Sequence, residues 1–216
     1  MASRKSRIAR KPLFRPQLVH LEARDVPAAN LTIQDAPVGI YPQFDFVDPN
    51  PNAGGQFGTT IVPLSTGNVV VTDPNDNAGG ANAGAAYLFN GTTGALISTL
   101  TGSTVDDQVG SGGVTALSNG NYVVVSRNWD NGAVVDAGAA TFGSGTTGVN
   151  GAITVANSLV GSTANDFVGS NGVTALINGN YVVASRNWDN GAEVDAGAAT
   201  FGSGTTGVSG DRKSVV

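Results

Sequence analysis

The 216-residue sequence lacks cysteine and has one histidine, His20. Without cysteine there can be no disulfide, zinc–thiolate site, iron–sulfur cluster or cysteine nucleophile. A single histidine, placed near the start of the chain, leaves the rest without a Ser/His/Asp relay or a multi-histidine metal site. No apolar run approaches the ~18 residues of a transmembrane helix. These absences exclude several catalytic and redox classes and a membrane-spanning helix.

Charged residues and strong helix formers are also scarce. Charged residues make up 12% of the chain, against an ordinary share of ~25%. Glycine, by contrast, occurs 31 times, about twice the ordinary share. Lysine, glutamate and methionine, which favour helices, contribute only a handful of residues. This composition predicts a β protein.

The few charges are distributed unevenly. Residues 1–24 contain seven of the eleven Lys and Arg residues, whereas residues 25–210 contain fourteen acids and two bases, Arg127 and Arg186. An acidic body repels phosphate, so we expect no nucleic-acid partner for it. The basic head is a separate object, which we interpret as a targeting or disordered segment over 1–30.

The body consists of repeated units. Gly102–Gly151 aligns without gaps on Gly161–Gly210, with identity at 42 of 50 positions. An older copy precedes them, in which Phe57-Gly58 and Gly67–Val71 match later segments. We therefore divide the body into a first unit (53–101), a second unit (102–160) and a third unit (161–210). Lead-in strands are predicted in 31–52. The tail 211–216 departs from the repeat and is read as a sequence artefact at the end of a fragment.

Each unit reads as short strands separated by turn signals. In the second unit a run at 114–117 is followed by Asn119-Gly120 and then by 122–126, a pattern that predicts a type I′ hairpin. Two further strands are predicted around 139–142 and at either 152–155 or 159–160. One unit cannot bury its faces alone, so neighbours must stack. We predict an all-β fold of antiparallel meanders arranged as a partial or open β-propeller; the alternative is a linear β-repeat stack or β-solenoid.

Two repeat families resemble these units. Phe57-Gly58 and Gly84–Phe89 resemble the FG-GAP repeat of integrin-type propellers. The segments 119–124, 128–132 and 137–141 resemble repeats of large bacterial haemagglutinin- or adhesin-like surface proteins. The segment 15–28 resembles the N-terminal export segment of planctomycete surface proteins. These resemblances imply a non-catalytic, secreted or cell-surface protein in adhesion or scaffolding, with surface polysaccharide or another surface protein as partner; its oligomeric state stays open.

The candidate ligand-contact residues lie in equivalent loops of the two later units. They are Arg127, Trp129, Asp130, Arg186, Trp188 and Asp189. An exposed Trp–Arg pair could stack on a sugar or hold a carboxylate. The other interpretation, which we favour, is that each tryptophan fills the space between units. If these loop residues contact a ligand, the alternative function is a carbohydrate- or calcium-dependent binding module.

Metal and catalytic chemistry have less support. Four carboxylates in the acidic loops are candidate metal ligands: Asp73, Asp76, Asp136 and Asp195. Their spacing supplies too few alternating oxygens for a recognisable calcium loop, and Asx turns explain the same residues. We thus expect no cofactor, with calcium as the ion to consider. The one adjacent acid pair of the repeats, Asp106-Asp107, is Asn165-Asp166 in the third unit, so we expect no enzyme activity.

Overall fold

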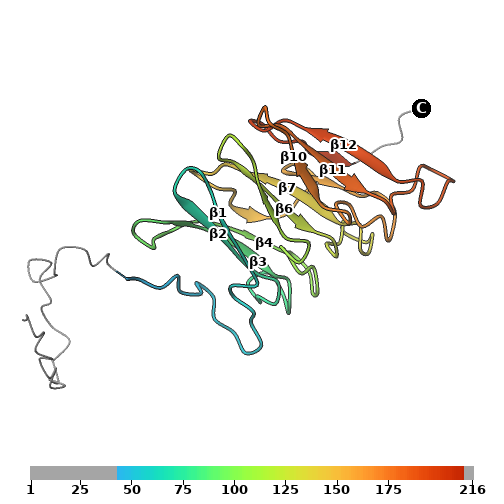
Figure 1. Cartoon of the computed structure of the whole chain (residues 1–216). Coiled ribbons are helices and arrows are strands. Elements are labelled where there is room, and N and C mark those ends of the chain that lie inside the picture. The colour runs from blue at the N-terminus through green and yellow to red at the C-terminus, as the bar shows by residue number, and fades with distance from the viewer. Residues whose placement is uncertain (1–42, 212–216) are drawn as a thin grey trace, which may run out of the picture. The chain divides into compact units, whose positions relative to one another are not determined.

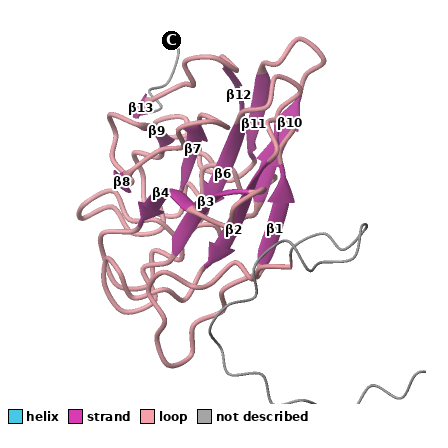
Figure 2. Cartoon of the chain, turned by 90° about the vertical axis from the view of Figure 1, so that its left-hand side faces the viewer, coloured by secondary structure: helices cyan, strands magenta, loops and turns pink. Residues whose placement is uncertain are grey.

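The computed structural model describes residues 43–211, which form strands joined by turns and loops (Figure 1). These residues contain no helix, so the predicted all-β fold is confirmed (Figure 2). The predicted targeting segment 1–30 lies outside the described residues, and so does the predicted tail 211–216 apart from Asp211. Of the lead-in strands predicted for 31–52, only 43–52 can be assessed, and no strand occurs there.

Three antiparallel meanders follow one another along the chain. The first consists of β1 (Thr60–Pro63), β2 (Asn68–Asp73), β3 (Ala85–Asn90) and β4 (Leu96–Thr101). The second consists of β5 (Val114–Ala116), β6 (Tyr122–Ser126), β7 (Ala139–Gly143) and β9 (Ser158–Val160). The third consists of β10 (Val173–Ala175), β11 (Tyr181–Ser185) and β12 (Ala198–Gly202). The sheets lie in chain order (Figure 1), an arrangement that fits both an open or partial propeller and a linear stack.

A short strand from each later unit joins the sheet of the unit before it. β8 (Gly151–Ala152) lies in the second unit but pairs in parallel with β4, Leu100 opposite Gly151. β13 (Gly210–Asp211) pairs in parallel with β9 in the same way. The fourth strand of the second unit, predicted at 152–155 or 159–160, is therefore two elements. Ser158–Val160 completes its own meander, and Gly151–Ala152 completes the preceding one.

The hairpin turns differ from the predicted type I′. Gly120 has a φ of +89°, but Asn119 is not among the residues with positive φ. The Gly120 amide donates to the Leu117 carbonyl at 3.0 Å, and the Leu117 amide donates to the Asn121 carbonyl at 2.8 Å. Ser118 therefore belongs to the loop, which has three residues and ends in a left-handed glycine. The type I′ prediction is wrong because it counted the loop one residue too short.

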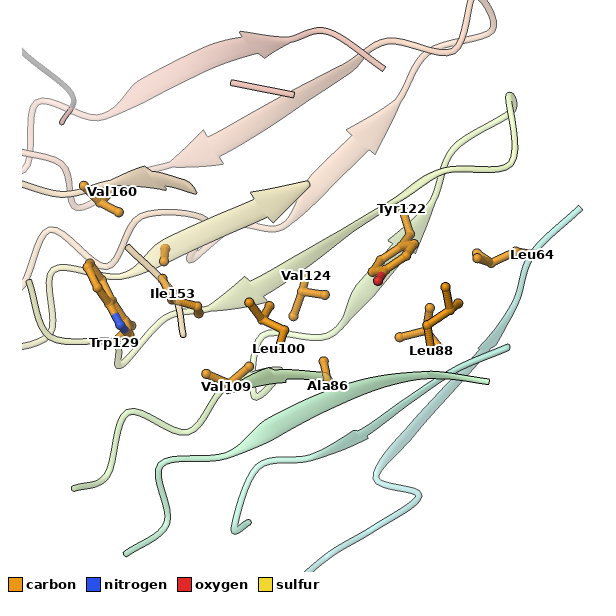
Figure 3. Close-up of a cluster of buried hydrophobic side chains, with 12 residues drawn as sticks. Leu64, Ala86, Leu88, Leu100, Val109, Tyr122, Val124, Trp129, Ile153 and Val160 are labelled. Atoms are coloured by element: carbon orange, nitrogen blue, oxygen red, sulfur yellow. The ribbon is translucent and has the colours of Figure 1, made fainter. Parts of the chain in front are cut away.

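The core lies between the sheets, and the middle sheet is buried on both faces. Val124 packs in the cluster between the first and second sheets, and Val123 packs in the cluster between the second and third. Successive side chains of a strand point to opposite faces, so an uninterrupted valine run suits a sheet covered twice. Full burial of each such side chain stabilises the fold by roughly 1.5–3 kcal/mol. Figure 3 shows Leu88, Leu100 and Tyr122 in the first of these clusters.

Candidate functional site

The tryptophans of the repeated loops lie inside the protein. Trp129 follows β6 and is 3% exposed, in the same cluster as Ile153 and Val160 (Figure 3). Trp188 follows β11 at the equivalent position and is 5% exposed. Both indoles are therefore buried, and Trp129 lies in the cluster between the first and second sheets.

The arginines of these loops are exposed and contact neighbouring loop atoms. The Arg127 guanidinium donates to the Ser111 carbonyl at 3.2 Å. The Arg186 Nε donates to the Asn187 Oδ1 at 3.3 Å. Because each arginine is exposed while the tryptophan two residues later is buried, the fold does not place the pair on one accessible surface.

The aspartates of the repeated loops hold the loop backbone. The Asp130 Oδ1 accepts the Asp136 amide at 2.8 Å, and the Asp189 Oδ1 accepts the Asp195 amide at the same distance. Asp136 adopts a φ of +52°, a conformation that Asp tolerates better than most residues. Burial, with the neighbouring Asp130 charge, raises the pKa of the Asp136 carboxyl. Each of these bonds joins residues six positions apart, so it closes the whole loop and is longer than the Asx turn that the sequence predicted.

One further aspartate in each later unit accepts a hydrogen bond from the backbone of the same loop. The Asp107 side chain is fully buried, and its Oδ1 accepts the Asp130 amide at 3.0 Å. Asp166 is equally buried and accepts the Asp189 amide at 3.0 Å. Both carboxylates thus stabilise the loops that carry the predicted ligand residues.

The first unit brings three carboxylates together, and this acidic cluster is the strongest candidate site. It consists of Asp48, Asp73 and Asp76, and one oxygen from each lies within 4.8 Å of the others. Asp73 ends β2 and Asp76 follows it in the next loop, both with 0% exposure. Asp48 comes from the lead-in segment before β1 and is half-buried. An all-oxygen set of this kind is suited to a hard cation.

Neutral donors satisfy part of the acidic cluster. The Asp73 Oδ1 accepts the Gln56 amide at 2.8 Å and the Asn75 amide at 3.0 Å. The Asp76 Oδ1 accepts the Asn50 Nδ2 at 2.8 Å, and its Oδ2 accepts the Tyr87 hydroxyl. Burial, together with the hydrogen bond to Asp76, raises the pKa of Tyr87 well above its usual range. Tyr87 therefore stays a neutral donor and does not neutralise the carboxylates.

Sequence reasoning named Asp73 and Asp76 as metal candidates but missed Asp48. Self-comparison finds residues that belong to the repeat, and Asp48 precedes it. A local signal was nevertheless present, since Asp48, Asn50 and Asn52 place side-chain oxygens at alternate positions, as a calcium loop does. The other two predicted candidates, Asp136 and Asp195, lie in the second and third units and are not part of this acidic cluster.

The fold and these loops define a tandem β-repeat protein. A short strand of each later unit pairs with the sheet of the unit before it. Comparison with family models finds three copies of one repeat, at residues 63–111, 116–170 and 175–214. The chain belongs to this family, which is described as a repeat of unknown function (DUF5650). No curated protein and no solved structure matches the chain. The predicted repeat architecture is confirmed, while the FG-GAP and haemagglutinin affiliations stay predictions.

Among residues 43–211, no helix has the length and apolar character needed to cross a membrane.

Proposed function

We propose that this chain is a non-catalytic repeat protein of the cell surface or the secreted fraction, acting as a scaffold or in adhesion. The observation that carries the proposal is that both boundaries between units are built alike. At each boundary, an asparagine of the earlier unit donates its side-chain amide to a glycine carbonyl of the later one. The pairs are Asn68 with Gly145 and Asn121 with Gly204, both at 2.7 Å.

A repeated boundary extends a surface and does not by itself create a unique cleft. The same boundaries also share a backbone contact: the Val109 amide donates to Ala83 at 3.0 Å, and the Val168 amide donates to Ala137 at 3.0 Å. Units that join through identical contacts suit a protein whose role is to span, space or display.

The adjacent acids of the second unit support a non-catalytic role because they accept hydrogen bonds that hold the loops. Asp107, half of the adjacent acid pair, accepts amides with both carboxylate oxygens. Its partner Asp106 has a φ of +65° and accepts the Asn82 side chain at 3.0 Å. Groups held in this way are suited to fixing turns.

Adhesion and surface location rest on sequence resemblance. The haemagglutinin- or adhesin-like segments and the export-like head support an extracellular or cell-surface location for this bacterial-type repeat. The same resemblance implies surface polysaccharide or another surface protein as the partner, and the acidic body disfavours strongly anionic ligands such as nucleic acid.

Location is tested by labelling intact cells that produce the chain with antibodies raised against residues 43–211. We expect labelling without permeabilisation, at a level similar to a known surface marker of the same cells. An antibody to a cytoplasmic protein serves as the control for leakage. Labelling seen only after permeabilisation would contradict the surface assignment.

Adhesion is tested separately from scaffolding with beads that carry the full chain. Retention of these beads on producer cells or on purified surface polysaccharide under flow would support adhesion. Retention no greater than that of albumin-coated beads, with surface labelling intact, would leave the scaffold role and remove adhesion.

A further inference from the structure

The acidic cluster arises where the first unit departs from the other two. The Asp76 carbonyl accepts the Gly84 amide at 2.8 Å, and the Trp129 carbonyl accepts the Gly138 amide at 2.9 Å. These matching backbone bonds show that Asp76 occupies the position of Trp129. A buried carboxylate of the first unit therefore occupies the position that a buried indole has in the second unit.

Asp73 departs from the repeat in the same way. Asp76 donates its amide to the Asp73 carbonyl at 3.2 Å, as Trp129 does to Ser126 at 3.3 Å. Asp73 thus takes the place of a small neutral serine. The two substitutions exchange a neutral, space-filling pair for two buried negative charges, to which Asp48 adds a third.

The described residues provide no cation near this charge. Arg127 and Arg186 are the bases within residues 43–211, and both are exposed and bonded in loops of the later units. Carboxylates within 4.8 Å of one another repel strongly when they are withdrawn from water. Neutral donors reduce this cost but do not balance the charge.

Two oxygens at the acidic cluster also lack a hydrogen-bond partner. These are the Asp73 Oδ2, on a side chain with 0% exposure, and the Asn52 Oδ1, itself buried. An acceptor buried without a partner is costly. Both oxygens converge on the space beside Gly55, since a Cβ built there would lie 3.0 Å from the Asp73 Oδ2 and 3.3 Å from the Asn52 Oδ1. The Asn52 carbonyl oxygen lies 3.2 Å from the same point.

We propose that the acidic cluster is a Ca²⁺ site, with Asp48, Asp73 and Asp76 as carboxylate ligands and Asn52 as an additional oxygen donor. Oxygens bound to one Ca²⁺ at 2.3–2.6 Å can be at most about 5 Å apart, a limit that the separation of up to 4.8 Å satisfies. The set has no nitrogen or sulfur ligand, which disfavours zinc. Gly55 is exposed, so the site has access to solvent.

Such an ion would fasten the lead-in segment to the first unit. Asp48 and Asn52 precede β1, whereas Asp73 and Asp76 lie at and after the end of β2. One Ca²⁺ would therefore replace, by ligand bonds, the packing that the indole supplies in the later units. The inference is independent of where the protein is located and of whether it mediates adhesion.

The test uses the full chain, freed of metal with a chelator, and titrates it with CaCl₂ in a calorimeter. We expect one Ca²⁺ per chain and a rise in Tm of roughly 5 to 10 °C at a hundredfold excess over Kd. Asp76→Asn keeps the side-chain shape and removes one ligand charge, so we expect at least a tenfold weaker Kd and at most about half the rise in Tm at the same Ca²⁺ concentration. Glu193→Gln removes an exposed charge of the third unit and should bind as the parent does.

A second variant tests the space without removing charge. Gly55→Ala would place a methyl group among the converging oxygens, and we expect weaker binding at unchanged net charge. If Asp76→Asn does not fold, as judged by circular dichroism, Asp48→Asn at the half-buried position replaces it. Absence of heat and of a Tm shift in the parent chain would overturn the proposal, as would unchanged binding in the acid variant. Saturable binding lost equally in Glu193→Gln would also overturn it, because that result indicates general attraction to an acidic surface.

Discussion

Asn121 uses both ends of its side-chain amide to join the second unit to the third. Its Nδ2 donates to the Gly204 carbonyl of the third unit at 2.7 Å, while its Oδ1 accepts the Gly145 amide of its own unit at 2.9 Å. Gly145 in turn receives the Asn68 side chain of the first unit. One residue type at one repeat position therefore fixes the contact between successive units.

We expect Asn121→Ala to destabilise the protein more than the same change at Asn180. Asn180 is the equivalent residue of the third unit and accepts the Gly204 amide at 3.0 Å, but within residues 43–211 it makes no bond to a following unit. The difference between the two variants isolates the bond across the boundary, for which we expect about 0.5–1.5 kcal/mol. Urea unfolding of both variants measures it. Equal costs would mean that the bond across the boundary contributes nothing.

Removal of the buried Trp129 indole should destabilise the protein more than removal of the Asn121 side chain. Trp129→Ala leaves a cavity in the core and should lower the free energy of unfolding by about 3–5 kcal/mol. Trp129→Phe, which keeps an aromatic ring, should cost less. Denaturant unfolding monitors both variants. An alanine variant of near-parental stability that had lost binding to polysaccharide would instead support a ligand-contact role for this residue.

Gly138 lies where two units come into backbone contact. A Cβ there would be 2.3 Å from the Val168 amide nitrogen, and φ is +73°. Gly138→Ala should therefore cost about 2–4 kcal/mol, from overpacking and the left-handed conformation together. Gly132→Ala is the matched control, since its φ is +64° and nothing lies within 4 Å of its Cβ. We expect it to cost only about 1–2 kcal/mol. Similar melting temperatures for the two variants would contradict the close approach.

Stability should fall at high pH because of Tyr122. Burial raises the pKa of its hydroxyl from 10.0 to about 12. The unfolded chain therefore loses this proton first, and the stabilisation, complete below pH 10, is lost as pH rises to about 12. The loss for this residue is about 2–3 kcal/mol. Tyr122→Phe should flatten the decline by that amount in urea unfolding series, leaving the part that other buried tyrosines contribute. An unchanged slope would show that Tyr122 ionises without cost.

The meanders could be predicted because their signals are local. The valines of 123–125 and the Asn119-Gly120 turn lie within a few residues of one another. The pairing of β8 with the sheet of the preceding unit could not be predicted. Gly151-Ala152 has little β preference, and its partner Leu100 lies about fifty residues earlier. Asp76 could be predicted as a candidate ligand because it lies in an acidic loop, whereas its neighbour Asp48 is brought to it only by the path of the lead-in segment.

Because β8 and β13 complete the sheets of the units before them, the sheets are completed in a fixed order during synthesis. β4 ends at Thr101, but the strand that covers its edge ends at Ala152. At a translation rate of about 5–20 residues per second, the first sheet waits roughly 3 to 10 s for that cover. Its edge is exposed to other chains throughout this interval. The sequence repeat and the finished sheet are therefore offset, because each of the first two sheets is completed by a strand of the unit made after it.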